Sequence, residues 1–150
     1  MSLFKGERQY YERSAETGPR PLLLRALESV EHTDTALDLG SGAGNDTRRL
    51  LHEGFLVTAV DSNPISAEYM RKITDPRLRF LNANIEDFNF TPNTYDIINA
   101  QSSLPFLEPE KLAAIMPKII TSLKPNGIFV GNFFGPNHNR KNYTSKRLSC

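Results

Sequence analysis

The stretch Ala36–Asn45, which reads ALDLGSGAGN, decides the fold of this 150-residue chain. A short apolar run that contains Asp38 leads into three glycines within five residues, at positions 40, 42 and 44. A glycine-rich turn directly after a strand permits backbone conformations and a close ligand approach that a Cβ would prevent. In open α/β sheets, ligands bind just beyond the carboxyl ends of the strands. The stretch therefore predicts a small ligand lying against bare backbone at the end of the first strand.

The rest of the chain alternates between strand and helix patterns. Apolar, β-branched runs predict strands at 35–39, 55–60, 78–81, 95–100 and 128–134. Helical spacing and proline starts predict helices at 21–30, 45–53, 63–73 and 109–123, with Asn45 or Asp46 capping the second. Pro117 is expected to kink or break the last helix, and 124–127 reads as a turn. This alternation predicts an α/β fold, with a parallel sheet of about five strands covered by helices on both faces.

An acidic residue, Asp61, ends the second predicted strand in the segment VTAVDSNP (57–64). It lies nineteen residues after Gly42, a position suited to accept hydrogen bonds from both hydroxyls of a ribose. A helix cap ahead of Pro64 is the simpler alternative. Because dinucleotides and other nucleoside cofactors share this feature, Asp61 indicates a nucleoside without choosing between them.

Charge around the glycines separates these cofactor classes. The spacing is G-x-G-x-G, and Asn45 stands where a dinucleotide-binding loop carries its third glycine. Asp38 precedes the loop and Asp46 follows it, so a pyrophosphate would meet carboxylates, whereas an ammonium and a sulfonium would be attracted. We interpret Asp46 as a helix-end residue stabilised by the helix dipole and Asp38 as a ligand residue.

A third polar segment, NANIEDF (82–88), follows the third predicted strand. Asn84 can pair with the edge of an adenine, and Ile85 can pack against its face. A polar loop with incidental asparagines is an equally good interpretation of the same residues.

Together these segments resemble the class I S-adenosylmethionine-dependent methyltransferases. YDIINAQSSLPFL (95–107) and LKPNGIFVGNFF (123–134) are similar to the family's fourth- and fifth-strand segments, so the resemblance covers about residues 20–134 in the family's order. It implies a Rossmann-like methyltransferase fold, S-adenosyl-L-methionine as cofactor and S-adenosyl-L-homocysteine as product. Tyr10-Tyr11, the Gly18–Pro21 segment and the SSLPF run are nearest to the tellurite-resistance-type small-molecule methyltransferases.

Carried over residue by residue, the resemblance implies one cofactor site whose members follow the strand ends. They are Asp38, Gly40, Ser41, Gly42 and Gly44 for the methionine moiety, Asp61 for the ribose, Ser62 and Asn63 beside the adenine, Asn84 and Ile85 for its edge and face, and Ala100 and Gln101 beside the sulfonium. Tyr10 and Tyr11 are candidates for a lid over the sulfonium, or for a segment that simply packs on the domain. Phe134 and His138 are substrate-side candidates, with a core phenylalanine and a loop histidine as the alternatives. No catalytic base and no metal ligand is identified.

Composition narrows the class of substrate. A formal net charge of +1 gives no field suited to nucleic acid. After the fourth strand the chain reads Asn99-Ala100-Gln101-Ser102, which differs from the [DN]-P-P-[FY] of enzymes that methylate nitrogen in DNA and protein. The expected acceptor is therefore a small molecule.

The single cysteine, Cys150, suits a cytoplasmic location, and no apolar run reaches the ~20 residues that would span a membrane.

The chain reads as one domain, 1–150, with an N-terminal lid segment at 1–18 and a tail at 135–150. The family's sheet closes with an antiparallel hairpin, which is apparently missing here unless the last residues substitute for it. A missing hairpin would expose a sheet edge through which the chain could form a homo-oligomer.

Two alternative functions remain: an NAD(P)-dependent oxidoreductase, or a non-catalytic cofactor-binding or interaction module truncated after the fifth strand. The sequence leaves open the acceptor, the oligomeric state and whether the natural protein continues beyond Cys150.

Overall fold

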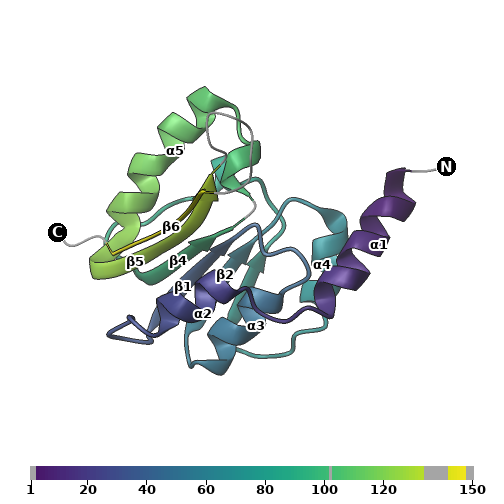
Figure 1. Cartoon of the computed structure of the whole chain (residues 1–150), viewed down its shortest axis with the longest axis horizontal. Coiled ribbons are helices and arrows are strands. Elements are labelled where there is room, and N and C mark those ends of the chain that lie inside the picture. The colour runs from purple at the N-terminus through teal and green to yellow at the C-terminus, as the bar shows by residue number, and fades with distance from the viewer. Residues whose placement is uncertain (1–2, 102, 134–141, 148–150) are drawn as a thin grey trace.

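A computed structural model describes residues 3–101, 103–133 and 142–147, with side chains from residue 6 to residue 133 apart from 102. Its core is a six-stranded sheet in the order β3-β2-β1-β4-β5-β6 (Figure 1). The strands are β1 (Thr35–Leu39), β2 (Leu56–Val60), β3 (Leu78–Leu81), β4 (Tyr95–Ala100), β5 (Leu123–Phe133) and β6 (Asn142–Arg147). The helices are α1 (Leu3–Ala15), α2 (Pro21–Leu27), α3 (Asn45–His52), α4 (Pro64–Met70) and α5 (Pro109–Ser122), with short 3₁₀ turns η1 (Ile85–Asp87) and η2 (Leu104–Phe106).

The first five strands are parallel, which confirms the predicted Rossmann-like sheet. β1 lies in the middle and pairs with β2 on one side and β4 on the other. The strand order reverses between β1 and β4, so a crevice is expected outside their carboxyl ends. All six residues of β4 and the last four of β1 are buried, as expected for strands covered on both faces.

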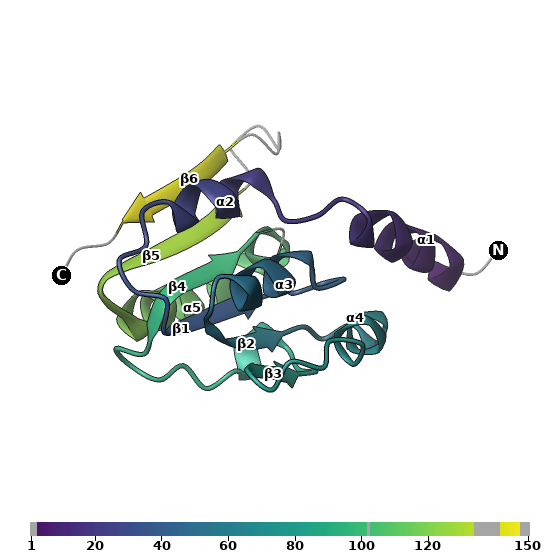
Figure 2. The ribbon, with the colours of Figure 1, turned by 90° about the horizontal axis from the view of Figure 1, so that it is seen from below.

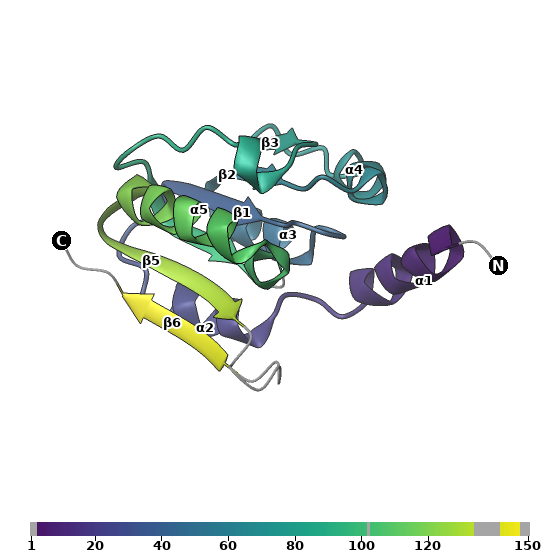
Figure 3. The ribbon, with the colours of Figure 1, turned by 90° about the horizontal axis from the view of Figure 1, so that it is seen from above.

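Helices cover both faces of this sheet, as predicted (Figures 2 and 3). Leu37 and Ile98 pack with α5 on one face, while Ile97 and Phe55 pack with α2 and α3 on the other. Within the described part of the chain, no helix combines the length and apolarity needed to cross a membrane.

The structure differs from two local expectations, the cap of α3 and a break at Pro117. The residue that caps α3 is Gly44, at φ +89°, and neither Asn45 nor Asp46 takes that place. Pro117 does not break α5, which runs unbroken from Pro109 to Ser122 with Pro117 exposed. The Thr121 hydroxyl donates a hydrogen bond to the Pro117 carbonyl at 2.8 Å, one turn later in the same helix.

The turn predicted at 124–127 lies inside β5 rather than before it. Tyr95 pairs with Leu123 and Ile97 pairs with Ile128, so the intervening KPNG residues bulge out of the strand pairing. Asn126 has φ +65°, a conformation that asparagine tolerates better than most residues.

The expectation that the closing strands are missing also needs correction. β6 pairs antiparallel with β5, from Ile128 opposite Arg147 to Phe133 opposite Asn142. The last residues therefore supply an antiparallel strand, which agrees with the alternative that they substitute for the family's hairpin. β6 also covers the edge of β5 on which the expected self-association rested, so β3 and β6 are the outer strands of the sheet.

Replacing Pro117 by alanine is expected to raise the free energy of unfolding by about 1–3 kcal/mol. A proline inside a helix cannot donate to the carbonyl four residues earlier and costs roughly 3 kcal/mol, part of which its rigidity recovers in the unfolded chain. Urea unfolding of Pro117→Ala beside Lys118→Ala, an exposed neighbour in the same helix, measures the difference. Equal stability of the two variants would contradict this account of α5.

Candidate functional site

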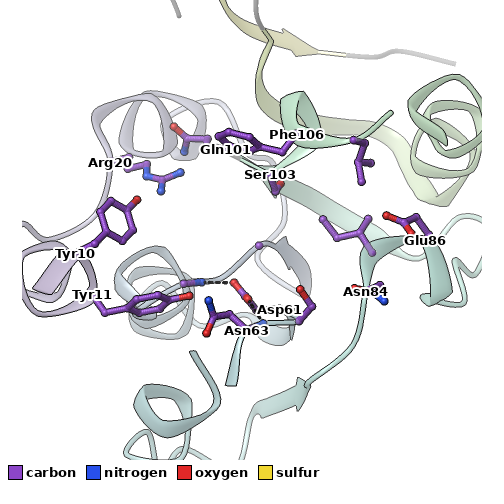
Figure 4. A pocket seen from close by; sticks show the side chains of 15 residues that line it. Tyr10, Tyr11, Arg20, Asp61, Asn63, Asn84, Glu86, Gln101, Ser103 and Phe106 are labelled. Carbon is purple, nitrogen blue, oxygen red and sulfur yellow. Dashed lines mark hydrogen bonds between the residues drawn. The ribbon is translucent and has the colours of Figure 1, made fainter. Parts of the chain in front are cut away.

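A cavity of about 360 Å³ lies beside the glycine loop (Figure 4), within the range of roughly 300–1,000 Å³ typical of small-ligand sites. Its wall is formed by residues that follow the ends of β1, β2, β3 and β4, together with residues of α1 and the chain before α2. They are Tyr10, Tyr11, Arg20, Gly40, Gly42, Asp61, Ser62, Asn63, Asn84, Ile85, Glu86, Gln101, Ser103, Phe106 and Leu107. The cavity therefore lies at the crevice that the strand order predicts.

The glycine loop is held by backbone hydrogen bonds to its neighbours. The amides of Gly40 and Ser41 both donate to the Val60 carbonyl, at 2.7 and 3.2 Å, which fixes the end of β1 against the end of β2. The Ser66 hydroxyl of α4 donates to the Gly42 carbonyl at 2.6 Å. The loop is thus rigidly placed by protein contacts alone.

Each glycine of the loop has a positive φ, but the three have different surroundings. A Cβ on Gly40 would lie 2.5 Å from the Ser103 Cβ, and one on Gly44 would lie 3.0 Å from the Met70 sulfur. Around Gly42, a Cβ would meet nothing within 4 Å. Gly40 and Gly44 therefore permit close packing within the protein, whereas Gly42 leaves open space on the cavity wall.

Asp61 lies at the end of β2 and points into the cavity (Figure 4). One carboxylate oxygen accepts a hydrogen bond from the Gly42 amide at 2.8 Å, and the other accepts one from the Asn63 amide at 2.9 Å. A carboxylate has about four acceptor positions, so each oxygen can still accept a bond from a ligand. Two amides from different segments thus orient Asp61 while leaving it able to bind a pair of hydroxyl groups.

Most of the cofactor residues expected from the sequence line this one cavity. They are Gly40, Gly42, Asp61, Ser62, Asn63, Asn84, Ile85 and Gln101. Gly44 lines neither this cavity nor the smaller one described next, and Ala100 is fully buried in the core. Phe134 and His138 lie outside the described residues.

Asp38 and Ser41 line an adjoining cavity of about 50 Å³ instead, together with Asp46. The two cavities share Tyr10, Arg20, Gly40 and Gly42 in their walls. Both oxygens of Asp38 already accept hydrogen bonds. The Ser41 hydroxyl is buried and has no hydrogen-bond partner among the described residues.

A buried polar network extends from Asp38. The Thr47 hydroxyl donates to one Asp38 oxygen at 2.6 Å, and the Asn99 amide donates to the other and to Asp46, at 3.0 Å in both cases. Gln101 donates to the Asn99 side-chain oxygen at 2.9 Å. Asp46 is thus a buried member of this network, a role that the helix-end interpretation missed.

Burial, and after it the nearby Asp46 carboxylate, raises the pKa of Asp38 to about 7 from its ordinary 3.8. The hydrogen bonds from Thr47 and Asn99 lower it, by less. Burial and the neighbouring carboxylate thus disfavour the ionised form of Asp38, and a cation placed beside it would favour that form.

Tyr10 and Tyr11 both line the cavity from α1, which is docked on α4. The guanidinium of Arg8 forms two hydrogen bonds to Glu68, at 2.8 and 3.0 Å. Tyr11 is buried and stacks on Tyr69 with ring centroids 5.8 Å apart. Burial and, less strongly, the Asp61 carboxylate raise the pKa of Tyr11, so its hydroxyl remains protonated.

Several wall residues were not predicted as site residues: Arg20, Glu86, Ser103, Phe106 and Leu107. Ser103, Phe106 and Leu107 belong to the segment after β4 that the family resemblance included. Their closeness in sequence to Gln101, a predicted site residue, could have identified them. Arg20 had a weaker signal, its position between two prolines. Among the described residues, no cluster of His, Cys, Asp and Glu could hold a metal ion.

Comparison by sequence identifies one family. Residues 36–127 match the methyltransferase domain family. A trans-aconitate 2-methyltransferase of Enterobacter sp. (strain 638) is 34% identical over 122 residues, 79% of this chain and 46% of that protein. The N-terminal Xaa-Pro-Lys N-methyltransferase 1 of Homo sapiens is 32% identical over 112 residues, 71% of this chain and 50% of that protein. The chain spans about half the length of these curated relatives.

Comparison by structure finds the same fold. The 1,6-didemethyltoxoflavin-N1-methyltransferase of Burkholderia thailandensis, solved with its substrate and S-adenosylhomocysteine, aligns with a TM-score of 0.73 at 23% identity. The alignment covers 99% of this chain and 65% of that one. The N-methyltransferase NodS of Bradyrhizobium japonicum WM9, solved with S-adenosylhomocysteine, aligns with a TM-score of 0.62 at 19% identity, over 84% of this chain and 72% of that one. At these identities the likeness establishes the fold alone.

Gly40→Ala is expected to lower the free energy of unfolding by about 2–4 kcal/mol, and Gly42→Ala by about 1–2 kcal/mol. Both variants force an alanine into left-handed backbone, but only the first also drives a Cβ into Ser103. Chemical unfolding of the two single variants measures the difference. The double variant Gly40→Ala/Ser103→Gly should recover part of the loss, and no recovery would show that the clash is not the cause.

Proposed function

The chain belongs to the S-adenosylmethionine-dependent methyltransferases, and we propose that it binds S-adenosylmethionine in the cavity beside the glycine loop and methylates a small-molecule acceptor there. The observation that carries this proposal is the geometry of Asp61. Amides of Gly42 and Asn63 orient its carboxylate toward a cavity whose wall also contains Asn84 and Ile85. These are the groups that a ribose and an adenine require.

The nucleoside end of the proposed site is the part of the wall formed by Asp61, Ser62, Asn63, Asn84 and Ile85. Asp61 would accept bonds from both ribose hydroxyls, since each of its oxygens keeps a free acceptor position. Asn84, which precedes η1, would face the edge of the adenine, and Ile85 would pack on its face.

The methionine end would lie along Gly40, Gly42 and Gln101, toward the smaller cavity. The open side of Gly42 lets a ligand approach the backbone closely, and the unpartnered Ser41 hydroxyl offers a hydrogen bond there. The buried carboxylates of Asp38 and Asp46 favour an ammonium and a sulfonium and disfavour a pyrophosphate. This charge is why we prefer S-adenosylmethionine to the NAD(P) of an oxidoreductase.

The chemistry asks these residues mainly to position reactants. The cofactor supplies a methyl carbon already activated by its positive sulfur, which an acceptor atom attacks in line. Gln101, held by its bond to Asn99, would orient the cofactor beside the reacting atoms. Tyr10 and Tyr11 on α1 would cover the sulfonium with ring faces and help exclude water, so residues 1–18 serve as a lid in this proposal.

Three further points belong to the same proposal. The acceptor is a small molecule. This is supported by the similarity to a trans-aconitate 2-methyltransferase and by the shared fold of a 1,6-didemethyltoxoflavin-N1-methyltransferase, although another relative is named an N-terminal Xaa-Pro-Lys N-methyltransferase. Residues 1–150 act as one cofactor-binding domain, with the tail from 135 onward contributing β6. The protein works in the cytoplasm, whose reducing conditions suit a chain with a single cysteine.

A non-catalytic role is the second candidate. In that role the chain would bind S-adenosylmethionine in the same cavity without transferring its methyl group. Detection of one methylated product from labelled S-adenosylmethionine would exclude this role.

Asp61→Asn is expected to weaken binding of S-adenosylhomocysteine by about 100-fold. Two hydrogen bonds from ribose hydroxyls to a charged acceptor are worth together about 3 kcal/mol, and 1.4 kcal/mol is tenfold in affinity. Calorimetric titration measures this loss of affinity. Asp75→Asn is the control: Asp75 forms an ion pair with Arg77 outside both cavities, so this variant should bind as the wild type does. An NADH titration runs in parallel: saturable NADH binding with none of S-adenosylhomocysteine would favour the oxidoreductase.

Binding of S-adenosylhomocysteine is expected to strengthen by about 3–10-fold from pH 6 to pH 8. In the free protein the pKa of Asp38 is raised to about 7, so near neutrality the carboxyl is partly protonated. A bound ammonium favours the ionised form, which lowers the pKa and releases a proton. Affinity therefore rises as pH increases through 7 and levels off above it.

Titrations at several pH values test this linkage, with Asp38→Asn as the matched variant. Its affinity should vary little over the same range, because no titrating group remains at position 38. An equally steep pH dependence in Asp38→Asn would assign the effect to another group.

A further inference from the structure

One part of the wall of the larger cavity takes no part in the proposed cofactor contacts. It is formed by Ser103, Phe106 and Leu107, which line this cavity and not the smaller one, and we call these three residues the acceptor wall. In Figure 4, Ser103 and Phe106 lie across the cavity from Asp61 and Asn63. We propose that the acceptor wall binds a flat, uncharged methyl acceptor, whose ring covers Phe106 and whose nucleophilic O–H or N–H group donates a hydrogen bond to the Ser103 oxygen.

Ser103 lies at the reacting end of the proposed site. A Cβ built on Gly40 would lie 2.5 Å from the Ser103 Cβ, so Ser103 packs directly against the glycine loop. In the proposed complex the methionine end of the cofactor lies along Gly40 and Gly42. A ligand atom that is bonded to Ser103 would therefore lie on the side of the cavity where the methyl group is transferred.

The hydroxyl group of Ser103 is set up to accept a hydrogen bond from a ligand. It donates its single hydrogen to the Leu39 carbonyl at the end of β1, at 2.9 Å. A hydroxyl oxygen also has two acceptor positions, which remain for a ligand that carries a donor. An O–H or N–H group fits this requirement, whereas a deprotonated oxygen or sulfur, which only accepts, does not.

This hydrogen bond would hold the nucleophilic atom for in-line attack. In the transfer, a bond forms between that atom and the methyl carbon, while the carbon–sulfur bond breaks and its electron pair stays on sulfur. The proton of the O–H or N–H group then leaves to water. Ser103 is a positioning residue in this step and gains no proton overall.

Phe106 offers the acceptor an exposed ring on an anchored segment. Its side chain is 64% exposed, more than any other large apolar side chain in the described part of the chain. Leu104 is fully buried, and the amides of Phe106 and Leu107 donate to the carbonyls of Ser103 and Leu104, at 3.3 and 3.1 Å. An exposed apolar surface beside a cavity is typical of a ligand-binding groove, and aromatic rings pack best on flat partners.

The charges around the cavity favour an uncharged acceptor. The acceptor wall contains no charged side chain, so a charged acceptor would lose hydration there without gaining a partner. Elsewhere on the wall, Glu86 pairs with Lys111 at 3.5 Å. Asp61 is the proposed ribose ligand, and Arg20, which also lines the smaller cavity, is placed to meet the carboxylate of the methionine end.

The inference rests on the proposed function, so the full chain is first saturated with S-adenosylhomocysteine. It is then titrated calorimetrically with 2-naphthol, with naphthalene, which lacks the hydroxyl, and with decahydro-2-naphthol, which keeps the hydroxyl and is not flat. We expect 2-naphthol to bind about fivefold more tightly than naphthalene and about 3–10-fold more tightly than decahydro-2-naphthol. The anion 2-naphthoate should bind more weakly than 2-naphthol.

Two variants should each remove one of these preferences. Ser103→Ala should bring 2-naphthol and naphthalene to within about twofold of each other and keep the preference for the flat probe. Phe106→Leu should do the reverse. Ser122→Ala is the matched control, because the Ser122 hydroxyl donates to the Ile119 carbonyl outside both cavities, and it should change neither ratio. A purely structural loss would weaken all probes alike and leave both ratios unchanged.

Three results would overturn the inference while the proposed function stands. They are equal affinity of 2-naphthol and naphthalene for the wild-type complex, tighter binding of 2-naphthoate than of 2-naphthol, and a preference for 2-naphthol that persists in Ser103→Ala. The first two are measured on the wild-type protein, so they hold even if a variant folds poorly. A folded chain that binds no S-adenosylhomocysteine would remove the proposed function itself, which the first titration reveals before any probe is added.

Discussion

The site depends on one carboxylate shared between two segments. Asp61 accepts the amide of Gly42 at the end of β1 and the amide of Asn63 at the start of α4, while the Val60 carbonyl just before it accepts the amides of Gly40 and Ser41. These contacts join the two central strand ends and fix the glycine loop before any ligand binds. A preformed site avoids paying the entropy of ordering a loop during binding. The same contacts leave acceptor positions on Asp61 directed at the cavity, so the group that builds the site is also its proposed ribose ligand.

Behind the loop the protein tolerates a polar arrangement that a structure optimised for stability alone would avoid. Asp38 and Asp46 are buried close to one another. Among the described residues, Thr47, Asn99 and the Arg20 amide donate the shorter hydrogen bonds to them, and Gln101 donates a longer one to Asp46, at 3.5 Å. Burying like charges is costly, and one consequence is the raised pKa of Asp38. A cation placed beside these carboxylates would offset that cost. The buried carboxylates of this network are therefore best explained by the positive charge of the proposed ligand, which would pair with them.

The sequence predicted what depends on local pattern and missed what depends on distant contacts. The predicted bounds of β1, β3 and β4 follow from apolar runs in the sequence and agree with the structure. Arg20 reaches the cavity because Asp46, 26 residues later, accepts its amide, and no local pattern encodes that. β6 is the polar segment NYTSKR, without apolar alternation, so its pairing depends on the backbone of β5. For Asp38 the sequence predicted a place at the ligand, which stays a prediction, but it did not predict the hydrogen bonds from Thr47 and Asn99 to both of its oxygens.

The glycine loop separates charges of opposite sign. The carboxylates of Asp38 and Asp46 are buried in the network behind it, and Arg20 lines both cavities. In the proposed complex the ammonium of the cofactor's methionine end is drawn toward the two carboxylates, and its carboxylate is drawn toward Arg20. Because both cavities share Arg20, Gly40 and Gly42, the two attractions act across only a few residues. Charges of both signs therefore orient the methionine end of the cofactor, and the reversed orientation is disfavoured. It would set the ammonium against Arg20 and the carboxylate against Asp38, so charge alone orders the cofactor before any contact specific to the acceptor is made.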